Sequence, residues 1–163
     1  MKNILIFGVG LIGGSLSLAL KRANSQLIIM GAGRSLTSLQ TALDLGIIDH
    51  VATDIPSAIQ TADVIVIAAP VAQTPLILTQ INPYLQSHTV ITDCGSTKSD
   101  IAQFAADILA DNANQFVPAH PIAGAEKTGP QAAMVDLFIG KNVIITPNAN
   151  TNRSEERRVG KEC

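Results

Sequence analysis

The stretch that decides the fold is residues 3–15, Asn-Ile-Leu-Ile-Phe-Gly-Val-Gly-Leu-Ile-Gly-Gly-Ser. Its first part, up to Phe7, is a short continuous apolar run, which is typical of a parallel strand covered on both faces. Apolar residues at helical spacing follow from Leu11 to Ala23. Glycines separate the two patterns, so the sequence predicts a buried strand that turns directly into a helix.

The glycines Gly8, Gly10 and Gly13 form the pattern G-x-G-x-x-G. The first allows a tight turn, the second lets the backbone approach a pyrophosphate, and the third lets the helix pack closely on the sheet. Free N–H groups at the start of the helix, including those of Leu11 and Ile12, would then bind the phosphate oxygens. The triplet alone is a weak signal, but a strand before it and a helix after it are the context it requires.

Composition narrows the class of protein. The 163 residues fit one domain, and the net charge of −2 gives no basic surface for nucleic acid or an anionic membrane. No apolar run reaches the roughly 18 residues that cross a bilayer, and the early glycines interrupt any signal-peptide core. Cys94 and Cys163 form neither a metal-ligand spacing nor a disulfide framework. We expect a cytoplasmic protein that binds a small molecule, with no metal, nucleic-acid or membrane partner.

Strand and helix signals alternate along the chain, which predicts an α/β fold with a doubly wound, mostly parallel sheet of the Rossmann type. Asp54 is the expected N-cap of one helix, and Gly46 is expected to end another. Strands are expected near 3–7, 26–30, 63–68, 89–92, 114–117 and 142–145, with a weak one near 50–52. Helices are expected near 10–23, 36–45, 55–61, 72–85, 97–110 and 130–137.

The end of the second predicted strand bears on the cofactor. An acidic residue about 20 residues past the last glycine would bind the ribose 2′-hydroxyl of NAD. Here Gly33 is followed by Arg34 and Ser35, and no carboxylate appears before Asp44. A guanidinium and a hydroxyl suit a 2′-phosphate, so the sequence favours NADP, with NAD still possible. Alternatively, Arg34 is a solvated residue at the start of a helix.

Ligands of doubly wound sheets lie outside the carboxyl ends of the strands, so the loops after the strands are expected to carry the chemistry. Ala69 and Pro70 follow one strand, and their small size would let the cofactor pass. Ser96 follows another strand, as partner of a catalytic histidine, as N-cap of the next helix, or as both. Asp93 and Lys98 flank it, and a structural or a functional role for them is open.

His120 is the candidate for acid–base chemistry, because imidazole titrates near neutrality and the residue lies in a predicted loop, 118–129, at the catalytic edge. The other two histidines, His50 and His88, are interpreted as structural or merely exposed.

Four segments carry a family resemblance: residues 8–15 (GVGLIGGS), 45–49 (LGIID), 92–98 (TDCGSTK) and 120–129 (HPIAGAEKTG). With these segments, the chain resembles over about residues 1–150 the bacterial prephenate and arogenate (cyclohexadienyl) dehydrogenases of tyrosine biosynthesis. The resemblance implies NAD(P)-dependent oxidative decarboxylation of prephenate or arogenate, with hydride transfer, loss of CO2 and aromatisation. It further implies that His120 accepts the substrate hydroxyl proton, that Ser96 orients this histidine and the substrate, and that Glu126 lies at the mouth of the substrate site.

The sequence also departs from that family. The acidic ribose ligand is replaced at Gly33, and the C-terminal helical domain, which in the family gives a homodimer contact and a substrate-binding arginine, is absent. Residues 151–163 are densely charged and resemble translated adapter sequence, so we expect them to be disordered, whether foreign or a genuine terminal arm. One alternative function is a dinucleotide-binding module without turnover. Another is a different NADP-dependent reductase with a Rossmann domain.

Overall fold

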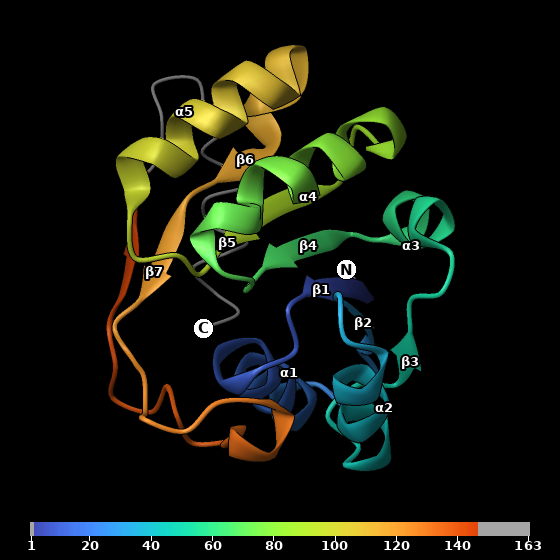
Figure 1. Ribbon diagram of the computed structural model, residues 1–163, viewed down its shortest axis with the longest axis vertical. Coiled ribbons are helices and arrows are strands. Elements are labelled where there is room, and N and C mark those ends of the chain that lie inside the picture. Colours follow the sequence, from blue (N-terminus) through green and yellow to red (C-terminus); the bar gives the residue numbers. More distant parts are fainter. Residues whose placement is uncertain (1, 147–163) are drawn as a thin grey trace.

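Six parallel strands form the central sheet of the computed structural model, which describes residues 2–146 (Figure 1). The strand order β3-β2-β1-β4-β5-β6 reverses direction beside β1, so the doubly wound Rossmann-type sheet is confirmed. The predicted tail at 151–163 lies outside the described residues. The strands are β1 (Asn3–Phe7), β2 (Ile28–Ala32), β3 (His50–Val51), β4 (Val64–Ile67), β5 (Val90–Asp93) and β6 (Phe116–Val117).

Five α-helices within residues 2–146 cover both faces of the sheet. In β1, Ile4 and Ile6 pack on the side of α1 and α2, while Leu5 and Phe7 pack on the side of α3, α4 and α5 (Figure 1). No helix in residues 2–146 combines the length and apolar character needed to cross a bilayer. The helices are α1 (Leu11–Ala23), α2 (Leu36–Asp44), α3 (Ile55–Thr61), α4 (Thr74–Ile81) and α5 (Lys98–Leu109), with 3-10 turns η1 (Val71–Gln73), η2 (Asn82–Tyr84), η3 (Ala110–Gln115) and η4 (Pro130–Ala132).

Two helix boundaries follow the local signals in the sequence. The Asp54 carboxylate accepts a hydrogen bond of 3.3 Å from the N–H of Ser57, which makes it the predicted N-cap of α3. Gly46 has a φ of +68° just past the end of α2, the conformation that favours glycine as a helix stop.

The chain after β6 differs from the sequence prediction. Residues 119–121, expected in a loop, form a strand β7 (Ala119–Pro121) that pairs antiparallel with β8 (Val143–Ile145). The strand predicted at 142–145 therefore exists but lies outside the parallel sheet. Pro118 and Pro121 make this segment look like a loop in the sequence. Proline is nevertheless tolerated at strand edges, where no N–H is required.

The helix predicted at 130–137 is wrong. Only the 3-10 turn η4 forms, and Ala133 is already extended, with φ −60° and ψ 135°. The segment instead packs on α1, where the Met134 N–H donates to Ser15 Oγ at 2.9 Å. A Cβ at Gly14 would lie only 2.9 Å from that of Ala133, so a small residue in α1 permits this close packing.

Asp49 links α1 to β2 through a partly buried ion pair with Lys21. Its carboxylate accepts hydrogen bonds from Lys21 Nζ at 2.7 Å and from the Ile29 N–H at 2.9 Å, and Lys21 also donates to the Gly46 carbonyl. Burial raises the pKa of Asp49, but the hydrogen bonds from Lys21 and Ile29 to its carboxylate, together with the positive charge of Lys21, lower the pKa by more. The pKa is therefore lowered from its ordinary value of 3.8.

Asp63 plays a similar part at the start of β1. Its carboxylate accepts from the N–H groups of Lys2 at 2.6 Å and Asn3 at 2.9 Å. Burial raises its pKa as well, but the two backbone donors together with nearby positive charge lower it by more, so that the pKa again lies below 3.8.

These lowered pKa values predict acid sensitivity of the fold. A carboxylate with a depressed folded-state pKa contributes stability above its unfolded pKa and loses it as pH falls through the folded pKa. The free energy of unfolding should therefore decline below about pH 4. Asp49→Asn, followed by urea denaturation at several pH values, should be less stable at pH 6 and should lose less on acidification. An unchanged acid slope in the variant would contradict this role of Asp49.

Candidate functional site

A groove with a volume of about 400 Å³ lies at the carboxyl ends of β1, β2 and β4, where the strand order reverses. Ligands of doubly wound sheets bind at this position. Six of the predicted cofactor-binding residues line the groove: Gly8, Gly10, Arg34, Ser35, Ala69 and Pro70. The other lining residues are Phe7, Val9, Gly33, Ser38, Leu39, Ile55, Gln73, Leu76, Ile77, Gln80, Gly129 and Pro130.

The three motif glycines have different surroundings. Gly8 has a φ of +94°, and a Cβ there would lie 2.7 Å from the Ala69 nitrogen. A Cβ at Gly13 would lie 2.2 Å from the Gly8 carbonyl oxygen, so only glycine lets α1 approach the turn. By contrast, a Cβ at Gly10 would meet no atom within 4 Å. The fold itself thus requires Gly8 and Gly13, whereas the space at Gly10 is open to a ligand.

The first turn of α1 begins directly after Gly10, which lines this groove, although Leu11, Ile12 and Gly13 are not among its lining residues. The first helical hydrogen bond runs from the Gly14 N–H to the Gly10 carbonyl, so the N–H groups of Leu11, Ile12 and Gly13 precede it and have no partner within the helix. Gly10 offers no side-chain cap, and the first turn contains no acidic residue. The end of the helix is therefore electropositive and suited to phosphate oxygens.

Arg34 and Ser35 lie at the other end of the groove, directly after β2. Arg34 is exposed, and within residues 2–146 it forms no ion pair. Ser35 is the N-cap of α2, and its Oγ accepts from the N–H of Ser38 at 3.2 Å and lies 2.9 Å from Ser38 Oγ. Ser35 thus has a structural task, and both Arg34 and Ser35 line the groove.

Sequence reasoning missed one wall of the groove. Gln73, Leu76 and Gln80 come from η1 and α4, and Leu76 is 62% exposed despite being apolar. The spacing of four between Leu76 and Gln80, one helical turn, is the signal that would have placed them on one face. Gly129 and Pro130 close the same groove from the segment after β7, which no local pattern indicates.

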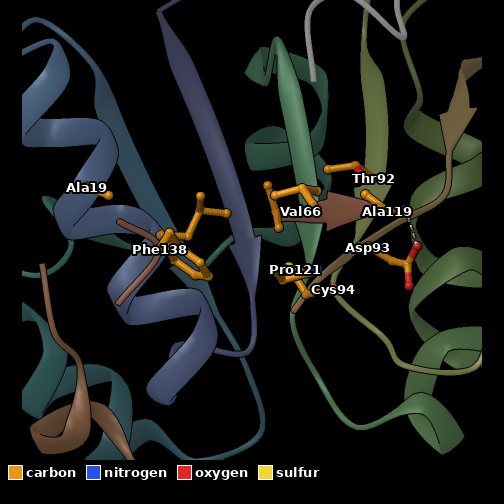
Figure 2. Close-up of a pocket in the computed structure, with 10 residues that line it drawn as sticks. Ala19, Val66, Thr92, Asp93, Cys94, Ala119, Pro121 and Phe138 are labelled. Atoms are coloured by element: carbon orange, nitrogen blue, oxygen red, sulfur yellow. Dashed lines mark hydrogen bonds between the residues drawn. The ribbon is translucent and has the colours of Figure 1, made fainter. Parts of the chain in front are cut away.

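His120 lies in the middle of β7, paired with Ile144 of β8. Its neighbours Ala119 and Pro121 line a separate apolar pocket of about 60 Å³ between α1 and the two-stranded β7–β8 sheet (Figure 2). Because side chains alternate along a strand, the imidazole of His120 points to the opposite side. Its Nδ1 is buried and has no hydrogen-bond partner among the described residues.

The other two predicted substrate-site residues are on the surface. Ser96 is exposed one residue before Thr97, the N-cap of α5, so the predicted N-cap role falls to its neighbour. Glu126 is exposed in the segment between β7 and Gly129. In residues 2–146, no side-chain hydrogen bond joins Ser96 to His120, and their pairing stays a prediction.

A parallel doubly wound sheet, a glycine turn with an open second position, and a bare helix start define a dinucleotide-binding domain of the Rossmann type. Residues 16–159 match the family described as prephenate dehydrogenase, nucleotide-binding domain. The chain therefore belongs to the prephenate dehydrogenase family.

Relatives in this family are considerably longer. The chain is 38% identical to prephenate dehydrogenase of Bacillus subtilis, over 93% of this chain and 41% of the relative. It is 33% identical to cyclohexadienyl dehydrogenase of Zymomonas mobilis, over 92% of this chain and 50% of that protein. The crystal structure of prephenate dehydrogenase from A. aeolicus, in complex with hydroxyphenyl propionate and NAD+, matches with a TM-score of 0.92. That match has 34% identity and covers 99% of this chain and 56% of the other. The chain thus spans about half the length of these proteins.

The contrast between two glycines gives a direct test of the site. Gly13→Ala should lower the melting temperature by several degrees, because overpacking against the Gly8 backbone costs about 1–3 kcal/mol. Gly10→Ala should leave the melting temperature nearly unchanged and weaken binding of a dinucleotide at least about tenfold, since its Cβ would occupy the pyrophosphate's space. Thermal melts and calorimetric titrations measure both effects. If Gly10→Ala binds as tightly as wild type, the phosphate does not lie there.

Proposed function

We propose that this chain binds NADP and forms the cofactor-binding part of an enzyme that oxidatively decarboxylates prephenate or arogenate in the cytoplasm. The observation that carries the proposal is the open position at Gly10 between the α1 start and Arg34, in a chain of this family. The pyrophosphate would lie at the N–H groups of Leu11 and Ile12. Ala69 and Pro70 would border the cofactor's path along the carboxyl ends of the strands.

NADP rather than NAD is proposed because of the charge at the far end of the groove. Arg34 has no carboxylate partner in the described part of the chain, and no acidic residue stands where a ribose 2′-hydroxyl would need an acceptor. A guanidinium beside the Ser35 hydroxyl supplies charge-assisted donors for a 2′-phosphate. The NAD+ in the A. aeolicus protein shows that a relative accepts the other cofactor, so preference in this chain would depend on this one contact.

For the chemistry we assign His120 as the base. Bound nicotinamide would accept a hydride from the ring carbon that bears the substrate hydroxyl. His120 would take the proton of that hydroxyl as it becomes acidic, and return it to the phenol oxygen once the electron pair of the lost CO2 has entered the ring. Ser96 would orient the imidazole and the substrate, and Glu126 would contact the substrate at the mouth of the site.

The alternative is a dinucleotide-binding module without turnover, favoured by the fact that the chain spans about half the length of its relatives. In the relatives' architecture, the remaining half would complete the substrate pocket and carry the homodimer contact. Steady-state assays of the chain with prephenate and with arogenate, each with NADP and NAD, separate the two functions. Cofactor binding without any product would support the binding module.

Arg34→Ala tests the cofactor preference. The variant should bind NADP about 10- to 100-fold more weakly, because charge-assisted hydrogen bonds to the 2′-phosphate are lost, and should bind NAD as before. Arg22→Ala, which removes an exposed arginine paired with Asp136, is the matched control and should change neither affinity. Calorimetric titration with both cofactors gives the comparison. Equal wild-type affinities for NADP and NAD would contradict the proposed preference.

His120→Asn tests the base. In a full-length enzyme built on this chain, kcat should fall by about 10²- to 10⁴-fold while cofactor affinity stays the same. Ser96→Ala should cost less and should weaken substrate binding. His88→Asn, at an exposed histidine beside Asp63, is the control. Near wild-type turnover in His120→Asn would remove the assignment of the base.

A further inference from the structure

A buried ion pair at the end of β5 is not used by the proposed chemistry. Asp93, the last residue of β5, is 1% exposed, and its Oδ2 accepts hydrogen bonds from Lys98 Nζ and, at 2.8 Å, from the Gly95 N–H. Its Oδ1 accepts from the Ala119 N–H at 3.1 Å (Figure 2). A buried carboxylate is costly unless it is paired and hydrogen-bonded, and this one is satisfied on both oxygens.

Lys98 contacts the other backbone polar group of the same residue. Its Nζ donates to the Ala119 carbonyl at 2.7 Å as well as to Asp93. The two side chains therefore hold both backbone polar groups of Ala119. This residue immediately precedes His120, and it lies 26 residues from Asp93 in the sequence.

The antiparallel pairing of β7 with β8 explains why Ala119 needs Asp93 and Lys98 as hydrogen-bond partners. Backbone hydrogen bonds join β8 to the β7 segment at Thr146 with Pro118 and at Ile122 with Asn142, on either side of the pair His120 with Ile144. In an antiparallel ladder, alternate residues direct their N–H and C=O groups toward the partner strand. Those of Ala119 thus point away from β8, toward the ends of β5 and α5. Asp93 and Lys98 take the place of a neighbouring strand on that edge.

We propose that Asp93 and Lys98 are positioning residues for His120, and that their hydrogen bonds to the N–H and C=O groups of Ala119 fix the strand that carries the base. The proposal rests on the proposed function, because it assigns a role relative to the reacting proton. An ion pair that only joined α5 to the sheet would require no bond to β7. Here two of the hydrogen bonds go to the residue next to the imidazole.

The chain contains a matched control for this ion pair. Lys21 also donates to an aspartate, Asp49, and to a backbone carbonyl, that of Gly46. Lys21→Met removes the same kind of interaction at a site between α1, α2 and β2. A loss that follows from weakened folding alone would appear in both variants, whereas a loss of positioning would appear only in Lys98→Met.

The test compares kcat with cofactor affinity in a full-length enzyme built on this chain. Lys98→Met should lower kcat by about 10- to 100-fold, the effect of misplacing a catalytic group by about 1 Å, with cofactor affinity unchanged. Lys98→Arg, which keeps the charge and a donor, should recover most of the rate, and Lys21→Met should keep the wild-type kcat. A wild-type kcat in Lys98→Met, or an equal loss in Lys21→Met, would overturn the proposal.

A spectroscopic readout on the chain itself separates positioning from folding. In Asp93→Asn, the amide resonances of Ala119 and His120 should shift and exchange with solvent faster, while those of Gly8 and Gly10 stay in place. If Lys98→Met fails to fold, Asp93→Asn carries the test, and unchanged Ala119 and His120 resonances in Asp93→Asn would reject the proposal. Lys98→Arg should leave these resonances close to their wild-type positions. Failure of the proposed function is seen separately, as retained turnover in His120→Asn.

Discussion

The structure depends first on the close approach of α1 to the turn after β1. A Cβ at Gly13 would lie 2.2 Å from the Gly8 carbonyl oxygen, so the helix start can rest on the turn only because Gly13 lacks a side chain. That contact places the start of α1 beside the turn, next to the open space at Gly10. The electropositive helix end therefore lies close to the groove, and the missing side chain of Gly8 lets Ala69 approach the same turn.

A second constraint holds the proposed chemical end of the site. The two-stranded β7–β8 sheet stands outside the parallel sheet, so the hydrogen bonds of the parallel sheet do not fix it. Side-chain hydrogen bonds fix it instead. Asp93 and Lys98 bind the backbone of Ala119, and Ser15 of α1 binds the segment after η4. The cofactor end is thus built by backbone packing, and the end that carries His120 by polar side chains.

Much of the fold could be predicted from the sequence because its signals are local. The apolar runs gave the parallel strands, and Asp54 and Gly46 marked helix boundaries through capping and a positive φ. The pairing of β7 with β8, and the extended backbone after η4 where the sequence predicts a helix, depend on contacts with distant elements. No local sequence pattern indicates such contacts. The same holds for the site. The roles of the glycine turn and Arg34 can be predicted from the sequence, whereas Gly129 and Pro130 reach the groove only through tertiary packing.

A crystal structure of this chain with NADP bound would test the central claim most directly. The pyrophosphate is expected over Gly10, with oxygens within about 3 Å of the Leu11 and Ile12 nitrogens, and the 2′-phosphate is expected at the Arg34 guanidinium. A pyrophosphate bound away from the start of α1 would contradict the central claim that the glycine contact builds the site. A 2′-phosphate pointing to solvent, away from Arg34, would contradict the cofactor assignment.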